Sequence, residues 1–306
     1  MAKIVIAGSL NLDFIVQVAR APQRGETLTG SQFVTLPGGK GANQACAVGR
    51  LAQPNTAVMI GCVGQDMYGR QLLESLSGCG VNHRHVRGAP EAATGVALIL
   101  VEASGQNQIV VVPGANDYLR PAEVTDALTV IGGSHLLLQL ETPLATVTAA
   151  AAHARRLGMT VILDPAPACE LPAELLRNVN ILTPNESEAL ALVGAAGDHI
   201  ALADAPDVAR ELLALGPQRV ILKLGAQGAF LADGDRARHL PARPVEAKDT
   251  TAAGDCFNGA LATGLAEGLT SDAAIAFANV AASIAITRIG AQASLPTRAE
   301  VEQALG

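Results

Sequence analysis

A single carboxylate beside a run of small residues is the feature of this sequence best suited to chemistry. Asp255 follows Ala252, Ala253 and Gly254, and an Ala-rich apolar pattern then continues to about Leu265. This pattern predicts a loop that feeds a helix N-terminus, where the first amides have no intrahelical partner and can bind an anion. The amides of 252–254 would hold a transferring phosphate while Asp255 takes the proton of the attacking hydroxyl. A helix that simply starts with an acidic first turn, which the helix dipole favours, fits the same residues.

A second glycine-rich loop opens another Ala-rich helix near the N-terminus. It reads Pro37-Gly38-Gly39-Lys40-Gly41-Ala42-Asn43-Gln44-Ala45. No Ser or Thr follows the lysine at the spacing of a Walker A loop, and the glycines do not match the dinucleotide fingerprint G-x-G-x-x-G. The two loops lie about two hundred residues apart and could face each other across a cleft.

Together the two loops resemble the signature motifs of the ribokinase (pfkB) family of sugar kinases. The family's Gly-Gly-x-Gly-x-Asn motif is matched by 38–43, and its Asp-Thr-x-x-Ala-Gly-Asp motif by 249–255. Further segments that look like this family are spread over essentially the whole chain, at 8–13, 25–27, 139–143, 183–186 and 287–292. Paired motifs with supporting segments are a much more specific signal than one motif alone.

The resemblance implies ATP-dependent phosphorylation of D-ribose at its 5-hydroxyl, giving D-ribose 5-phosphate and ADP. It makes Asp255 the general base and the Ala252, Ala253 and Gly254 amides the anion hole. It implies a sugar site formed by Asn11, Asp13, Gly39, Lys40, Gly41, Asn43, Glu141 and Asp255. It also implies a nucleotide site formed by Asn185, Lys223, Gly225, Ala226, Gly228, Gly254 and Asn279, where Lys223 departs from the Thr seen in some members.

Two metal ions are implied by the same resemblance. Mg²⁺ would be carried mainly by the nucleotide phosphates and water, with Glu186 and Glu188 acting through that water shell. A monovalent cation, usually K⁺, would lie beside the anion hole. Its expected ligands, most of them backbone carbonyls, are Asp249, Thr251, Ala285, Arg288, Gly290 and Ser294. Carbonyl ligands leave almost no side-chain signature, so residue types alone do not reveal this cation site.

The order of the elements that must position these groups predicts an α/β fold. After Pro121 the pattern alternates strands and helices, with strands expected at 135–140, 160–163, 181–182 and 220–224. Alternation of this kind predicts a mostly parallel sheet with helices on both faces. The earlier strands expected at 12–19 and 28–36, and a hairpin over 94–112, do not fit it and predict a small separate sheet. The resemblance implies one ribokinase-like domain over 1–306, with a lid from about 12–36 and 94–112 that pairs two subunits into a homodimer.

Several polar positions are expected to come directly after strands. They are Asn11 and Asp13, Glu141, Asn185, Gly225 and Asp255. Because ligands of open α/β sheets bind at the carboxyl ends of the strands, these positions are predicted to share one edge. Taken singly, each residue serves equally well as a turn residue or a cap.

Helix boundaries are marked in three places. Thr142 is expected to cap a helix with Pro143 at its first position. The stretch Ala273–Ile286 is expected to be a buried helix, and Thr297 and Glu300 form a capping box for the last one.

Composition excludes several classes of protein. The chain of 306 residues is 49% hydrophobic and 16% charged, with a net charge of -7 and no Lys/Arg cluster, which disfavours a nucleic-acid partner. The most apolar stretch, 273–286, is interrupted by polar residues and falls short of the roughly 20 residues of a membrane span. The five scattered cysteines form no C-x-x-C pair, so a cytoplasmic protein without a membrane partner is expected.

Other activities remain open at this level. Within the family they are deoxyribokinase, fructokinase and nucleoside kinase, although an aromatic content of 2% disfavours a pocket that stacks a nucleobase. A non-catalytic sugar-binding regulator on the same fold would have no need of Asp255. A dehydrogenase lacks its fingerprint, because no G-x-G-x-x-G follows the first strand.

Overall fold

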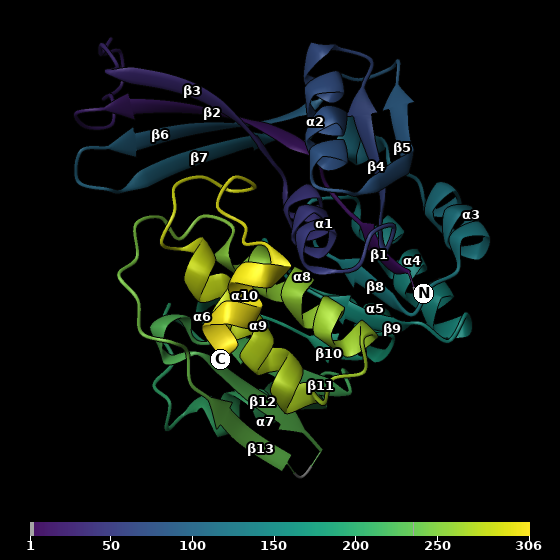
Figure 1. Ribbon diagram of the computed structural model, residues 1–306. Helices are drawn as coiled ribbons and strands as arrows, with labels where there is room; N and C mark the ends of the chain where they lie inside the picture. The colour runs from purple at the N-terminus through teal and green to yellow at the C-terminus, as the bar shows by residue number, and fades with distance from the viewer. Residues whose placement is uncertain (1–2, 235) are drawn as a thin grey trace.

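The computed structural model describes residues 3–234 and 236–306, and a large twisted sheet runs through the centre of this part of the chain (Figure 1). Its strand order is β13-β12-β11-β10-β9-β8-β1-β4-β5. All pairs from β11 to β5 are parallel, and β12 and β13 add an antiparallel edge. The strands span Ile4–Ala7 (β1), Ala57–Gly64 (β4), Asn82–Ala89 (β5), His135–Leu138 (β8), Thr160–Leu163 (β9), Ile181–Leu182 (β10), Arg219–Lys223 (β11), Ala229–Asp233 (β12) and Arg236–Leu240 (β13). The predicted mostly parallel sheet is confirmed.

Helices cover both faces of this sheet and create two cores. Along β1, Ile4 and Ile6 pack into one core while Val5 and Ala7 pack into the other, because successive side chains of a strand point to opposite faces. Helices α1 (Lys40–Leu51), α2 (Met67–Gly78), α8 (Ala253–Ala266), α9 (Ser271–Ala285) and α10 (Arg298–Leu305) line the first core. Helices α3 (Pro121–Ile131), α4 (Leu144–Arg156), α5 (Ala173–Arg177), α6 (Glu186–Leu192) and α7 (Ala205–Ala214) line the second. The expected two-sided cover is therefore observed.

A second, four-stranded sheet projects from the main body (Figure 1). Its order is β3-β2-β6-β7, with β2 at Asn11–Val18, β3 at Gln32–Gly38, β6 at Gly95–Glu102 and β7 at Asn107–Val112. The predicted small sheet is confirmed, although β3 starts at Gln32 rather than at residue 28. Strand β3 ends at Gly38 and α1 begins at Lys40, so the small sheet is joined directly to α1 at its base.

Two further predicted boundaries are wrong, and two other predictions are confirmed. Helix α4 begins at Leu144, and Pro143 rather than Thr142 is its N-cap, because the proline has an extended backbone with ψ of 129°. Strand β8 ends at Leu138, since the Leu140 amide turns away to the Ala166 carbonyl. Thr297 and Glu300 form the expected capping box, and α9 is the expected buried helix. Strands β5, β12 and β13 were not predicted from the sequence.

Within the residues described here, none of the helices combines the length and the apolar character needed to cross a membrane.

Candidate active site

The first glycine-rich loop joins the small sheet to α1 at a very close backbone approach. Gly39 has φ of 86°, and a Cβ there would lie 2.7 Å from the Asn11 amide nitrogen. Glu141 closes the start of α1, because its Oε2 accepts from the Lys40 amide at 3.0 Å and from Ser9 Oγ at 2.6 Å. The N-terminus of α1 is thus occupied by a carboxylate of the protein. Its first turns instead present the side chains of Lys40, Asn43 and Gln44.

The second loop gives α8 a start with open amides. Ala252, the N-cap, has a left-handed backbone with φ of 59°, a conformation that non-glycine residues rarely adopt and that clusters at functional sites. The Ala253 amide donates to the Thr250 carbonyl at 3.2 Å. Among the described residues, the Gly254 and Asp255 amides have no backbone or side-chain acceptor. Ala253 is therefore not a free donor, whereas the Ala252 amide, like that of Gly254, has no acceptor among the described residues. Of the three expected amides, those of Ala252 and Gly254 remain available.

A lysine side chain lies directly beside these amides. The Nζ of Lys223 at the end of β11 would be 3.2 Å from a Cβ built on Gly254. It also donates to Asp164 Oδ1 at 2.7 Å, with the two side chains only 13% and 3% exposed. An ammonium group and the positive end of a helix therefore meet at one point, which favours a bound anion.

Asp255 lies in the first turn of α8 and is buried, with 5% of its surface exposed. Its Oδ2 accepts from Asn43 Nδ2 at 2.9 Å and its Oδ1 from Gln44 Nε2 at 3.1 Å. Burial raises the pKa of Asp255 to about 6, while Lys40 and the two amides oppose that rise. The carboxylate is thus mainly ionised at neutral pH, and its pKa is close to the range in which a general base works best.

The groups expected to bind sugar form a second polar cluster around Lys40. Burial, with added repulsion from Glu141 and Asp255, raises the pKa of Asp13 to about 7. Burial lowers the pKa of Lys40, but the surrounding carboxylates, with Asp255 the strongest, outweigh it and raise the pKa above its ordinary value. Asn11 is 3% exposed, and its Oδ1 accepts from Asn116 Nδ2 at 2.8 Å. Carboxylates, amides and an ammonium are therefore concentrated in one small volume.

A cavity of about 780 Å³ adjoins this cluster. This volume is within the usual range for small-ligand sites. Every residue predicted for the nucleotide lines it: Asn185, Lys223, Gly225, Ala226, Gly228, Gly254 and Asn279. Ala252, Ala253, Asp255 and Lys40 line it as well, so the cavity runs from the nucleotide candidates to the candidate base and the sugar cluster. Asn185 also forms a reciprocal capping box with Glu188 at the start of α6.

Three of the residues expected to hold a monovalent cation, Asp249, Thr251 and Gly290, lie together where two loops meet. Asp249 accepts from the Thr251 amide at 2.9 Å and from the Gly290 amide at 2.8 Å. The Lys248 amide donates across the same junction to the Ile286 carbonyl. One of the expected ligands is already engaged, because the Ala285 carbonyl accepts from the Arg288 amide. The Arg288 side chain pairs with Glu300 on α10. Only residues 252 and 253 separate the 249–251 segment of this junction from the open amides of Gly254 and Asp255 in α8.

The expectation that every candidate follows a strand is only partly right. Glu141, Asn185 and Gly225 do follow β8, β10 and β11. Asn11 and Asp13 instead lie within β2 of the small sheet, and Asp255 lies on α8, far beyond β13. These residues still meet, because α8 and β2 both return to the carboxyl edge of the large sheet.

Sequence reasoning missed four buried polar residues around this site. They are Gln44, Asn116, Gln139 and Asp164. Asp164 follows a predicted strand, so the rule that found Glu141 could have found it as well. Asn116 lies in a 3₁₀ turn (Gly114–Tyr118), and no sequence pattern there indicates that its side chain bonds the backbone of Leu10.

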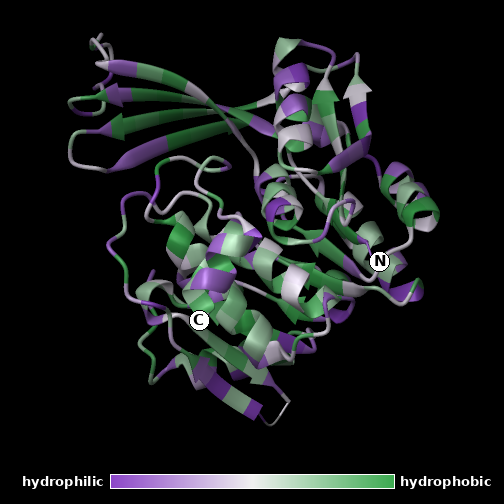
Figure 2. Ribbon diagram, in the orientation of Figure 1, coloured by the Kyte–Doolittle hydropathy of each residue, from purple (hydrophilic) through white to green (hydrophobic). Residues whose placement is uncertain are grey.

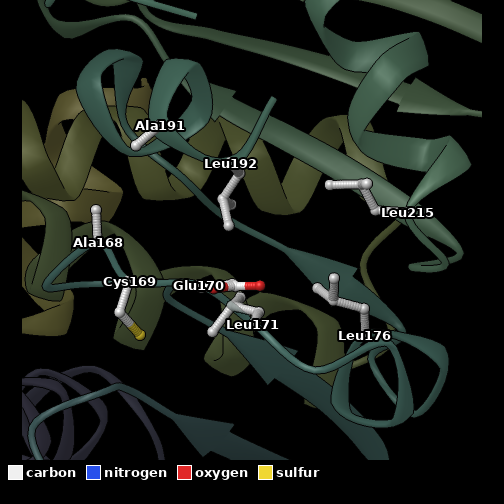
Figure 3. Close-up of a pocket in the computed structure, with 8 residues that line it drawn as sticks. All are labelled: Ala168, Cys169, Glu170, Leu171, Leu176, Ala191, Leu192 and Leu215. Carbon is white, nitrogen blue, oxygen red and sulfur yellow. The ribbon is translucent and has the colours of Figure 1, made fainter. Parts of the chain in front are cut away.

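A different cavity, of about 330 Å³, lies beside α5 and α6 (Figure 3). Its wall is mainly aliphatic and is formed by Ala168, Cys169, Glu170, Leu171, Leu176, Ala191, Leu192 and Leu215. Glu170 is the one carboxylate among them, and no predicted site residue lines this cavity. The candidate active site is therefore the larger cavity.

Similarity to known proteins extends over nearly the whole chain. A family model described as "pfkB family carbohydrate kinase" matches residues 1–298. The chain is 40% identical to the ribokinase of Bacillus subtilis over 307 residues, covering 100% of both chains, and 40% identical to that of Haemophilus influenzae over 299 residues, covering 97% of this chain and 96% of the relative. A solved structure of Arabidopsis thaliana ribokinase complexed with ribose and ATP matches with a TM-score of 0.89 and 32% identity, covering 99% of this chain and 98% of that one.

Proposed function

The chain belongs to the pfkB family of carbohydrate kinases, and from that membership we propose that it transfers the γ-phosphoryl group of ATP to the 5-hydroxyl of D-ribose. The observation that carries this proposal is the position of Asp255. It lies between the cavity lined by the nucleotide candidates and the cluster that contains Asp13, Lys40 and Glu141. A base at that boundary can contact a sugar hydroxyl and the phosphoryl group that it attacks.

In this proposal the polar cluster binds the sugar. Neighbouring hydroxyls of a ribose can donate to the carboxylates of Asp13 and Glu141 and accept from Lys40 and Asn43, since each hydroxyl is both a donor and an acceptor. Asn11 completes the set of candidates and is held in place by Asn116. Because Gly39 and Gly41 carry no side chains, their backbone can pack closely against that of residues 8–11, which holds this loop beside the sugar cluster.

The phosphate chain would occupy the larger cavity. The open amides of Gly254 and Asp255 and the ammonium of Lys223 are positioned to stabilise negative charge on the transferring phosphoryl oxygens, and such fixed donors act without reorganisation. The glycine backbone at 225–228, with Ala226 between, and Asn279 would face the rest of the nucleotide.

The chemical step follows from this arrangement. The 5-hydroxyl oxygen attacks the γ-phosphorus in line with the departing ADP, while Asp255 accepts the hydroxyl proton. The phosphorus–oxygen bond to ADP breaks, and Asp255 releases its proton to water after the product leaves. A positioned base of this kind contributes roughly 10²–10⁴ in rate.

The residues present fit the Mg²⁺ that a kinase needs. Glu186 and Glu188 both line the cavity next to the nucleotide candidates, and their carboxylates are suitable acceptors for metal-bound water. When bound with the nucleotide, Mg²⁺ neutralises phosphate charge. Among the described residues no group of three or more His, Cys, Asp and Glu side chains is placed to hold a metal ion by itself, so its main ligands would be phosphate oxygens.

We also propose a monovalent cation at the junction of the 249–251 and 285–294 loops. The oxygen donors there suit a hard cation, and Asp249 supplies a negative charge. The expected set was Asp249, Thr251, Ala285, Arg288, Gly290 and Ser294, of which the Ala285 carbonyl is the least available. When bound, K⁺ adds positive charge near the start of α8.

The small sheet is proposed to be a lid that also pairs two subunits. Its strands are rich in hydrophobic residues (Figure 2). Their exposed apolar side chains are Phe33, Leu98, Val110 and Val112 on one face and Val34, Ile109 and Val111 on the other. All six residues of edge strand β7 are exposed, and such an edge is usually covered in native proteins. Val111→Glu should convert a dimer into a monomer in light scattering, while the exposed control Val130→Glu on α3 should not. A wild type that is already monomeric would refute this pairing.

The cytoplasm remains the proposed compartment, which the five free cysteines support because thiols stay reduced there.

The activity is tested by coupled detection of ADP with Mg-ATP and ribose, 2-deoxyribose, fructose or adenosine, with K⁺ or a large organic cation. We expect turnover that is highest with ribose and that requires K⁺. Turnover with another sugar would change the substrate and keep the mechanism, whereas sugar binding without ADP release would remove the kinase activity and leave a binding protein.

A further inference from the structure

The amide of Gln44 bridges the two carboxylates that are buried most deeply at the site. Its Nε2 donates to Asp255 Oδ1 at 3.1 Å and to Asp164 Oδ2 at 3.0 Å. Gln44 is fully buried, and Asp164 and Asp255 are 2% and 5% exposed. One nitrogen thus uses both of its hydrogens on two negatively charged groups, where hydrogen bonds are stronger than between neutral partners.

A second glutamine determines which end of that amide faces the carboxylates. Gln139 Nε2 donates to Gln44 Oε1 at 2.6 Å, and Gln139 is also fully buried. If Gln44 were rotated by half a turn, its oxygen would face Asp164 and Asp255, and its nitrogen would face the Gln139 donor. Asp164, Asp255 and Gln139 therefore all favour the same orientation of the Gln44 amide.

The buried environment shows that Gln139 acts through its nitrogen. Its Oε1 has no hydrogen-bond partner among the described residues. That oxygen occupies the space where a side chain of residue 8 would begin, since a Cβ on Gly8 would lie 2.0 Å from it. An unpaired buried amide oxygen costs free energy. Gln139 therefore contributes through its Nε2, which donates to Gln44 Oε1.

We propose that Gln44 is a positioning residue that orients the carboxylate of Asp255 and stabilises its charged form, and that Gln139 fixes the orientation of Gln44. The proposal deepens the proposed kinase activity and rests on Asp255 as its base. Gln44 is fully buried and is not among the residues that line the larger cavity, so it acts through Asp255. Asp164, which also pairs with Lys223, connects the same amide to the phosphate side of the site.

The expected effect is a shift in the ionisation of Asp255. Its surroundings contain other charged or titratable groups, which are Lys40 on α1, Asp13 on β2, Asp164 after β9, Lys223 on β11 and Cys256 on α8. In Gln44→Met the volume is retained and the donor is lost while those groups stay. The pKa of Asp255 should rise above about 6 by roughly one to two units, the value of one hydrogen bond to a charged group.

The test follows two readouts. The first is the pH dependence of kcat, whose acid limb should move to higher pH by the same one to two units, roughly, in Gln44→Met. The second is the carbon-13 titration of the Asp255 carboxyl, assigned by its loss in Asp255→Asn, which needs no turnover. Thr263→Val, which removes a buried hydroxyl from α8 far from the base, controls for a general disturbance of the core and should leave both readouts unchanged.

Gln139 is tested by a double-mutant cycle. Gln139→Met should shift the Asp255 titration in the same direction as Gln44→Met but by less. The double variant should match Gln44→Met alone, because Gln139 acts only through Gln44. Additive shifts would overturn the role of Gln139, and an unchanged titration in Gln44→Met would overturn the whole proposal. If the wild type fails to phosphorylate ribose, the kinase assignment fails separately, and the carbon-13 titration still decides this proposal.

Discussion

Replacing Asp255 with Asn removes the proposed base while keeping nearly the same shape. We expect kcat to fall by about 10²–10⁴, which corresponds to about 3–5 kcal/mol in the activation free energy. The affinity for ribose should change much less, because the other polar groups of the sugar cluster remain. The loss therefore belongs to the chemical step rather than to binding.

Asp255→Asn should lower the stability of the folded protein only slightly. Both oxygens of Asp255 accept from amide donors, Asn43 and Gln44, so an amide at position 255 leaves one donor facing its own NH₂ group. An unsatisfied buried donor costs about 1–3 kcal/mol. For a chain of 306 residues this is a decrease in Tm of roughly 2–5 °C, and relief of the buried charge offsets part of it.

The pH profile separates a lost base from a damaged fold. With a pKa of about 6, Asp255 is roughly 99% ionised at pH 8 and roughly 10% ionised at pH 5, so wild-type kcat should fall about tenfold between them. In the variant the residual kcat should not show this acid limb.

The assay is single-turnover phosphoryl transfer with saturating Mg-ATP and ribose, accompanied by calorimetric ribose binding and thermal unfolding. Asp207→Asn, which alters an exposed carboxylate on α7, is the matched control and should behave as wild type. A variant that keeps activity within about tenfold of wild type, or that retains an acid limb near pH 6, would refute the assignment of Asp255 as the base.

Three further predictions concern the neighbouring groups. The pKa of Asp13 is raised to about 7, so calorimetric ribose affinity should increase as pH rises through about 7 and should lose this dependence in Asp13→Asn. Because the pKa of Asp13 is higher in the folded than in the unfolded state, its contribution to stability is fully present below the ordinary value of 3.8 and is lost as pH rises through about 7. The Tm of wild type should therefore decline over this pH range more than that of Asp13→Asn. Asn116→Ala removes three buried hydrogen bonds, two to Leu10 and one to Asn11, and should lower the free energy of unfolding in urea by about 2–4 kcal/mol and weaken ribose binding. The control Asn178→Ala, which removes one surface hydrogen bond from a partly exposed side chain, should change both much less. Lys223→Met should raise the KM for ATP about tenfold or more with little change in the KM for ribose, and Lys223→Arg should restore part of the loss; equal changes in both constants would contradict a contact to phosphate.

The parts of the fold that the sequence predicted depend on local pattern. A buried strand such as β9 is a short apolar run, and the capping box at Thr297 and Glu300 uses contacts within one turn. The start of α8 is likewise a local pattern of small residues before an apolar helix. Predicted element boundaries were wrong where backbone conformation, rather than residue type, set the end of the element. At Pro143, for example, a non-helical backbone makes the proline the N-cap of α4.

The candidate site was predicted where its residues belong to contiguous motifs. Both glycine-rich loops and Asp255 were identified in this way, whereas the nucleotide candidates followed from the family resemblance. The structure places the nucleotide candidates, Lys40 and Asp255 around one cavity. The sequence could not indicate that the Ala253 amide is already bonded to Thr250, because that bond depends on the left-handed backbone at Ala252.

The sequence by itself therefore determined the α/β class, the two loops and the identity of the candidate base, since periodicity and local motifs are written in neighbouring residues. Only the tertiary structure decided which distant side chains hold that base. Gln44 and Asp255 are separated by 211 positions, and Gln139 and Gln44 by 95, so no local pattern links them. Burial and hydrogen bonding, which give Asp255 its pKa near neutrality, arise only when α1, α8 and the ends of β8 and β9 pack together.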